Sequence, residues 1–386
     1  MAEPLARWVE SRVRREPRCR TDQLDSYTNA PAATLVVPMA SDEADIRLQA
    51  LWVAVDELLA RATLPGILAH NLGPLAAHRL RRLGEPLPAR LALEERTATF
   101  CMLLAKPLLE RVRSSCEGPL LVIKGPEIAR LYPGGARRFG DIDVLSEDAA
   151  DLQRALVGQG MTEVHDPLLT PEFHHLQRLQ SATGLHVEIH KSPRWLVGSR
   201  PPSTREIFDT SVPLSLGVTG ISTPSPPHHA LILAAHAWDH EPLWTLRDLI
   251  DIAAMSAYAD ERELDRTAER WGMHRVWRTT HRAIDAAFYG GRKTFPLRTW
   301  ARHLELVRDR TGFESHLTRL LSGYWAMPPK YATVRATRVL YNLIAPNPGE
   351  TWLAKARRVP RSFQKLRALE DRSETAASTA DRPDSP

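Results

Sequence analysis

The spacing of hydrophobic residues separates a central segment of the chain from a helical segment on either side of it. Between residues 44 and 116, apolar side chains recur every three or four positions, for example in DIRLQALWVAVDELLARA and LALEERTATFCMLLAKPLLERV, and this spacing predicts helices. Pro107 should kink or interrupt the second of these, because proline lacks the backbone donor that a helix needs. Helical spacing returns from Pro224 to about Leu369, as in PSPPHHALILAAHAW and LWTLRDLIDIAAMSAYA.

The central segment alternates short strand-like stretches with helix-like ones. PLLVIK, DIDVL and LHVEIH predict strands, and helices are expected over residues 126–131 and in EDAADLQRALVGQG. This interleaving indicates a small α/β unit. The segment FHHLQRLQ, residues 173–180, is interpreted as structural, although loops near the strands could touch a substrate.

These patterns predict an α+β fold, in which a small mixed sheet is flanked by helical regions. We expect an irregular segment over residues 1–43, helices over 44–117, an α/β core over 118–223, a C-terminal helical domain over 224–371 and a tail over 372–386. The tail, RSETAASTADRPDSP, is polar and is expected to be disordered, because it has too little apolar surface to bury.

The composition is that of an ordinary globular protein, with 43% hydrophobic and 25% charged residues. The net charge of +5 is compatible with a polyphosphate ligand but is too small to indicate nucleic-acid binding unless the charge clusters. The basic run over residues 355–367 is interpreted as a solvated face, with a polyanionic partner as the alternative.

Cysteine usage and hydropathy predict a cytoplasmic protein. Cys19, Cys101 and Cys116 show no CxxC spacing, so neither a disulfide framework nor a zinc ribbon is supported. No apolar run approaches the roughly 18 residues of a membrane span, and no signal-peptide core follows the N-terminal charges. We therefore expect no membrane partner.

The candidate chemistry centres on carboxylates carried by the predicted strands. Side chains alternate between the two faces of a strand, so Asp141 and Asp143 share one face while the apolar residues between and after them face a core. In LHVEIH the same alternation places Glu188 opposite the buried face, with His190 as a neighbour. If the two strands pair, three carboxylates converge, which is unfavourable without a cation. Oxygen ligands of this kind suit Mg²⁺, so Asp141, Asp143 and Glu188 are the predicted metal ligands.

An anion-binding turn is predicted upstream of the aspartates. In VIKGPEIARLY, Lys124 and Gly125 lie between a strand and a helix. Glycine lets the backbone approach a ligand closely, and a helix N-terminus presents free N–H groups to an anion. Lys124 would reach a phosphate as a point charge, and Arg137 and Arg138 would take further phosphate oxygens. For Arg138 the alternative is a salt bridge to the acidic cluster. Together with a metal, these residues describe a nucleoside triphosphate site.

The C-terminal helical segment offers further candidates for a cleft. His229 and His236 are seven positions apart and therefore share one face of a predicted helix. They are candidates, with Arg247 and Asp248, to line the cleft from the helical side. The alternative is that they are core histidines with polar partners, and zinc is not supported without a third ligand.

The motifs KG, RRFGDIDVL and VEIH together resemble those of the uncharacterised nucleotidyltransferase family, which is part of the DNA polymerase β superfamily. The upstream HNLGPLAAHRL and the downstream HHALILAAHAWDHEPLWTLRDLIDI are similar to helical segments of the family, so the resemblance covers roughly residues 50–260. Members of the family occur in bacterial gene clusters, including those for ribosomally made peptides such as lasso peptides.

The resemblance implies a polymerase-β-like core and Mg²⁺-dependent (or Mn²⁺-dependent) transfer of a nucleotidyl group from an NTP. Asp141 and Asp143 would hold two metal ions, and Glu188 would bind one of them and orient or deprotonate the acceptor. Lys124 and Gly125 would hold the triphosphate, at a turn where the wider superfamily usually has Gly-Ser. This difference leaves the transferred group less certain.

The acceptor implied by the resemblance is a hydroxyl or phosphate of a small molecule or peptide, as in natural-product tailoring. Two alternatives stay open. One is a toxin-like transfer to tRNA or protein, for which we would expect an extended basic groove. The other is a catalytically silent scaffold that binds a nucleotide or a protein partner.

Overall fold

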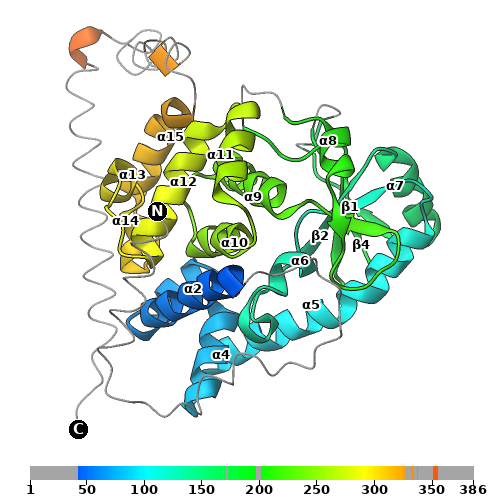
Figure 1. Ribbon diagram of the computed structural model, residues 1–386, viewed down its shortest axis with the longest axis horizontal. Helices are drawn as coiled ribbons and strands as arrows, with labels where there is room; N and C mark the ends of the chain where they lie inside the picture. The colour runs from blue at the N-terminus through cyan, green and yellow to red at the C-terminus, as the bar shows by residue number, and fades with distance from the viewer. Residues whose placement is uncertain are drawn as a thin grey trace.

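The computed structural model describes residues 42–326, except 168, 171–172 and 197–200, together with 332–333, 337 and 351–354. Over these residues the chain forms a seven-stranded mixed sheet with helices around it, so the fold is of the α+β class (Figure 1). The basic run over 355–367, the predicted tail and residues 1–41 of the predicted N-terminal segment lie outside the described residues. None of the described helices is long and apolar enough to cross a membrane.

The sheet has the strand order β3-β4-β5-β2-β1-β7-β6. Its strands are β1 Leu120–Val122, β2 Asp141–Ser146, β3 Thr162–Val164, β4 Arg178–Gln180, β5 His186–His190, β6 Val212–Pro213 and β7 Ile221–Thr223. β2 is parallel to β5, and β1 is parallel to β7, whereas the other neighbouring strands are antiparallel. The three strands predicted from the sequence are therefore confirmed as the centre of the sheet.

Helices come before, between and after the strands of the sheet along the chain. The first group is α2 Asp42–Ala60, α3 Leu64–Ala69, α4 Gly73–Leu83 and α5 Ala89–Ser114. Within the sheet region lie α6 Pro126–Ala129, α7 Ala149–Gly158 and α8 Thr204–Asp209. The last group is α9 Pro226–His240, α10 Leu246–Ser256, α11 Glu261–Arg270, α12 His274–Phe288, α13 Phe295–Thr299, α14 Arg302–Leu306 and α15 Gly312–Ala326.

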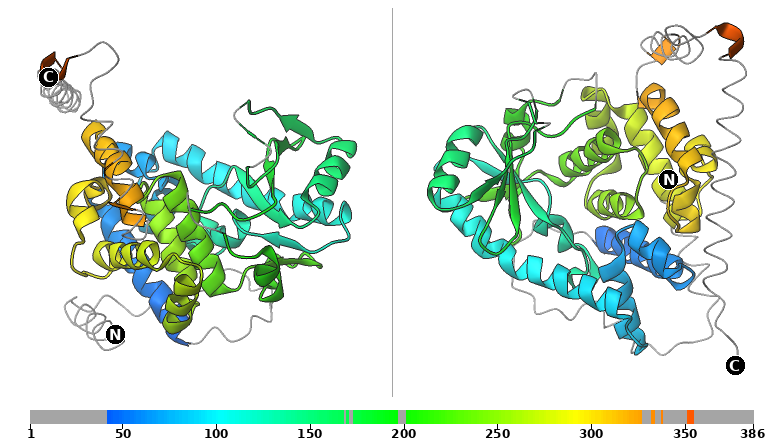
Figure 2. Two further views of the ribbon diagram at one scale, coloured as in Figure 1. Left: turned by 90° about the horizontal axis from the view of Figure 1, so that it is seen from above. Right: turned by 180° about the vertical axis from the view of Figure 1, so that it is seen from behind.

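The alternation along the central strands gives the sheet two different faces. Ile142 and Val144 of β2 pack into a core with side chains of α5 and α7, whereas Leu145 joins a larger core with α9 and α10. Figures 1 and 2 show α5 and α7 on one side of the sheet, and α9 and α10 on the other. Since Asp141 and Asp143 share the face of Leu145, they point toward α9 and α10.

Two local predictions differ from the structure. α5 continues without interruption through Pro107, because the carbonyl group that proline leaves without a donor belongs to Leu103, which is 70% exposed and so lies where water can solvate it. The helix expected over 126–131 is the four-residue α6, and its shortness makes its dipole a weak source of anion affinity. The strands β3, β4, β6 and β7 were missed, because they are too short to show alternation and lack the continuous apolar run that marks β1.

Candidate active site

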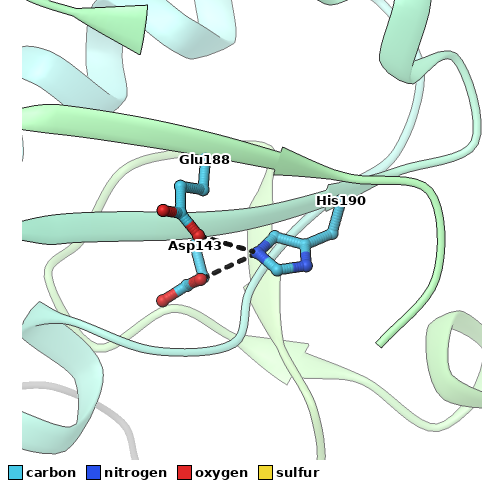
Figure 3. A group of neighbouring side chains, drawn as sticks. All are labelled: Asp143, Glu188 and His190. Carbon is cyan, nitrogen blue, oxygen red and sulfur yellow. Dashed lines mark hydrogen bonds and ion pairs between the residues drawn. The ribbon is translucent and has the colours of Figure 1, made fainter. Parts of the chain in front are cut away.

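The pairing of β2 with β5 brings the predicted carboxylates together. The register places Asp143 directly opposite Glu188 and Asp141 opposite His186. Because opposed residues in a sheet project to the same face, the side chains of Asp143 and Glu188 converge (Figure 3). His190, two residues after Glu188, projects to the same face and turns its ring toward both carboxylates.

Asp143, Glu188 and His190 form a compact group of potential metal ligands. The Nε2 atom of His190 lies 2.7 Å from Oδ1 of Asp143 and 3.9 Å from Oε2 of Glu188. One ligand atom from each of the three residues lies within 4.8 Å of the others. His190 thus holds the third place in this group, for which the sequence suggested Asp141.

The surroundings shift the pKa values of the two aspartates in opposite directions. Burial favours a raised pKa for Asp143, but the hydrogen bond from His190 and the charges of His190 and Lys124 outweigh it and lower that pKa below its usual range. The pKa of Asp141 is raised, first by burial and then by the negative charges of Asp143 and Glu188. Burial and the neighbouring carboxylates together therefore favour the protonated form of Asp141 over that of Asp143.

This donor set fits a divalent cation. Two facing carboxylates and an imidazole nitrogen are ligands that Mn²⁺ accepts, and the carboxylates alone suit Mg²⁺. A bound cation would also offset the negative charges of Asp143 and Glu188, which add to burial in raising the pKa of Asp141. Of the predicted ligands, Asp143 and Glu188 belong to the compact group with His190, and Asp141 lies close enough for their charges to act on its pKa.

The Lys124-Gly125 turn lies beside the carboxylates. Burial lowers the pKa of Lys124, against the opposing effect of Asp143 and Asp248, which lie near its ammonium group. Lys124 makes no hydrogen bond or ion pair with any residue that the structure describes. Gly125 has φ 83° and ψ −120°, and a Cβ added there would lie 3.1 Å from the carbonyl oxygen of Asp141. The turn is therefore packed closely against the start of β2.

Residues of α9 and α10 face the same region from the helical side. The pKa of His236 is lowered well below its usual value by burial and then by Lys124, with Asp143 opposing the shift, so His236 lies near both residues. Arg247 and Asp248 both act on the pKa of Lys124, and Thr245 donates a 2.7 Å hydrogen bond to Oδ2 of Asp248. These three predicted cleft residues thus surround Lys124.

Two buried arginine nitrogens near Lys124 have no acceptor. Arg137 binds Asp251 with two hydrogen bonds of 2.6 and 2.7 Å, and its Nη1 is buried without a partner among the described residues. Nε of Arg247 is likewise buried without one. Both arginines act on the pKa of Lys124. Each arginine has a carboxylate partner, Asp251 for Arg137 and Asp248 for Arg247, but each keeps one buried N–H that has no acceptor among the described residues.

Two predicted site residues make contacts outside the carboxylate group. Arg138 points toward α5, where its Nη1 is 3.1 Å from Oε2 of Glu94. It was predicted to bind phosphate, with a salt bridge to the acidic cluster as the alternative, and its salt bridge is with Glu94 instead. His229 is fully buried, and its Nε2 lies 2.9 Å from the carbonyl oxygen of Ile123. Burial lowers its pKa to about 4. Seven residues of helix span about 10 Å. His229 and His236 therefore share one face of α9, but His229 contacts Ile123 whereas His236 lies near Lys124 and Asp143.

The structure adds residues that the sequence pattern did not single out. Arg178 of β4 donates a 2.8 Å hydrogen bond to Oε1 of Glu188. The rings of His174 and His175 lie 5.4 and 5.5 Å from that of His190, and the pKa of His174 is lowered to about 3 by burial and by the neighbouring histidines. All three belong to the segment 173–180 that was interpreted as structural. In the sequence, the adjacent His174 and His175 were the one feature that could have pointed to this segment.

A family model described as "Uncharacterised nucleotidyltransferase" matches residues 57–287, which is more than half of the 386-residue chain. The matched span contains β1, β2 and β5 and the helices α9 and α10 that face them. A search of curated proteins and a search of solved structures each found no match.

Proposed function

The chain belongs to the uncharacterised nucleotidyltransferase family, and from this membership we propose that it transfers a nucleotidyl group from an NTP to an acceptor oxygen. The proposed reaction depends on Mg²⁺ or Mn²⁺ and uses the face of the sheet that carries Asp143 and Glu188. The resemblance of the motifs supports two finer proposals. The sheet would be a polymerase-β-like core, and the acceptor would be a hydroxyl or phosphate of a small molecule or peptide, as in natural-product tailoring.

The observation that carries this proposal is that a cluster of carboxylates lies beside donors that have no acceptor. Burial, and after it the charges of Asp143 and Glu188, raise the pKa of Asp141 on the carboxylate face. The adjoining turn has Lys124 and two arginine nitrogens without an acceptor. A buried donor without a partner costs about 1–3 kcal/mol. A divalent cation with a triphosphate would satisfy both sides at once, since the cation binds the carboxylates and the phosphates bind the donors.

The proposed roles of the residues follow from their positions. Asp143 and Glu188, with Asp141 and His190 as the further candidates, would hold the metal, which neutralises the phosphates and activates the acceptor oxygen when bound. The acceptor oxygen would attack the α-phosphorus as the bond to the leaving pyrophosphate breaks, and Glu188 would orient the acceptor or take its proton. Lys124 would bind the triphosphate, and Gly125 gives its backbone room to approach.

The test is nucleotide binding by isothermal titration calorimetry, with and without Mg²⁺ or Mn²⁺. We expect metal-dependent NTP binding by the wild type. Asp143→Asn removes the charge of one ligand and should weaken binding at least tenfold, about 1.4 kcal/mol. Lys124→Met should weaken it with the metal present, because it removes a phosphate contact.

The matched control is Asp151→Asn, which removes an equivalent charge from the exposed side of α7 and should leave binding unchanged. Absence of nucleotide binding under every metal condition would refute the proposal, and equal loss in the control would show that only the overall charge matters. If no nucleotide binds, the alternative of a catalytically silent scaffold that binds a protein partner would be preferred.

A further inference from the structure

A second site lies on the C-terminal helices, away from the carboxylate face. α12 packs against α9 and α10, which separate it from the sheet (Figure 1). A pocket with a volume of about 740 Å³ opens between α12, the loop after it, α13 and the end of α15. This volume is in the range of pockets that bind small or medium-sized ligands.

The lining of this pocket, which we call the basic pocket, is dominated by positive side chains. Six cationic residues line it: Arg275, Arg278, Arg282, Arg292, Lys293 and Arg298. Asp285 is the acidic residue among the lining residues, so the positive side chains outnumber the negative one six to one. The net positive charge, which was too small to indicate nucleic-acid binding unless it clusters, is therefore clustered in this pocket.

The arginines of this pocket lie close together, and several of them have no acidic partner among the described residues. Arg275, Arg278 and Arg282 recur at intervals of three and four residues, so they form one stripe along α12. Lys293 is paired with Glu305. The side chains of Arg278, Arg292 and Arg298 are exposed and make no hydrogen bond or ion pair within the described part of the chain. Like charges brought together without counter-ions repel one another, so the pocket favours an anion.

Aromatic residues complete the pocket. Phe295 is 47% exposed, and Trp325 stacks against it with ring centroids 5.7 Å apart and an interplanar angle of 15°. The indole N–H of Trp325 donates a 2.8 Å hydrogen bond to Thr279, which fixes the orientation of this pair. An exposed aromatic ring beside several arginines is the combination that binds unpaired bases and their phosphates.

We infer that the basic pocket binds a single-stranded nucleic acid, with its phosphates on the arginines and a base on the open part of the Phe295 ring. A bare polyphosphate or an acidic peptide would use the arginines but would leave the ring without a role. The site is separate from the proposed active site, and the inference does not depend on nucleotidyl transfer.

The test is binding of a fluorescently labelled single-stranded RNA to the full chain, measured by anisotropy over a range of KCl concentrations in EDTA. EDTA removes metal-dependent binding at the carboxylate site. In Arg278→Gln/Arg298→Gln, loss of two phosphate contacts should reduce the slope of log K against log salt by about 1.4 and weaken binding roughly 25-fold near 0.1 M salt. Phe295→Leu should weaken binding without changing the slope, because it removes stacking and no charge.

The control for charge is Arg262→Gln/Arg266→Gln, which removes two exposed arginines from α11. It should bind RNA like the wild type. Equal losses in the two double variants, or no RNA binding by the wild type, would overturn the inference. Unaltered binding by Phe295→Leu, or equal competition by inorganic polyphosphate, would show a site for bare polyanions, and equal competition by polyglutamate would show a site for an acidic peptide. Either result would overturn the assignment to nucleic acid.

Discussion

Gly125 shows how a single residue shapes the candidate active site. Its backbone conformation is open to glycine and costly for a residue with a Cβ, and the turn it forms lies against the carbonyl of Asp141. The sequence suggested that glycine is needed here for the approach of a phosphate. The structure adds that glycine is also needed for the approach of β2, which holds the two aspartates.

Gly125→Ala and Gly160→Ala should differ in stability and in nucleotide binding. Both positions have positive φ, 83° and 89°, but an added Cβ meets nothing within 4 Å at Gly160. We expect each substitution to lower the free energy of unfolding by about 1–3 kcal/mol, with the larger loss at Gly125 because of the added contact. In urea denaturation and in NTP titration, only Gly125→Ala should also weaken nucleotide binding. Equal nucleotide binding by the two variants would contradict a role for this turn.

At the scale of elements, a buried ion pair joins the sheet to the helical region. Arg137 precedes β2 and Asp251 lies on α10, and their side chains are 5% and 4% exposed. Tyr132 donates a further 2.6 Å hydrogen bond to Asp251. Burial alone would raise the pKa of Asp251, but Arg137 and these hydrogen bonds lower it. The pair therefore fixes α10, and with it Arg247 and Asp248, over the Lys124 turn.

Removal of one partner should cost more than removal of both. Asp251→Ala leaves the Arg137 charge buried without its partner and should lower the free energy of unfolding by about 3–5 kcal/mol. Arg137→Met/Asp251→Leu removes both charges and should cost less than Asp251→Ala alone. Urea denaturation of the two single variants and the double variant gives the coupling energy. Additive losses would mean that the two elements are held together by other contacts.

Over the whole molecule, the buried histidines couple stability to pH. The pKa of His229 is lowered to about 4 by burial, from an ordinary value of 6.5. His303 is also shifted, to about 3, by burial and then by Arg310. The unfolded chain binds protons at these histidines below about pH 6.5, whereas the folded chain does not, so protonation favours unfolding. Their contribution to stability is complete above pH 6.5 and is lost as the pH falls toward the folded values.

We expect the free energy of unfolding to fall steadily between pH 6.5 and 4. The shift of His229 from 6.5 to about 4 is 2.5 pH units, which corresponds to about 3 kcal/mol over this interval. His229→Gln should flatten the pH dependence of the urea midpoint, whereas a change of the exposed His165 to Gln should not. A pH profile that is the same in the wild type and in His229→Gln would show that this histidine has the same pKa in the folded and unfolded states.

Local periodicity accounts for the parts of the site that could be predicted. The three central strands, the shared face of Asp141 and Asp143, and the Lys124-Gly125 turn all follow from residues within a few positions of one another. Periodicity could not separate His229 from His236, because both satisfy the same helical spacing. It also could not identify β4, which has three residues, although Arg178 of that strand binds Glu188.

The sequence by itself determined which residues lie on which face of each strand and helix, because side-chain direction repeats with the local backbone geometry. Tertiary structure decided what each face meets. It set the register that places Glu188 opposite Asp143, and it turned Arg137 toward α10 but Arg138 toward α5. It also gathered the arginines of α12 and the loop after it into one pocket. These contacts join segments that are distant in the chain, and their partners are chosen by packing, which no local pattern records.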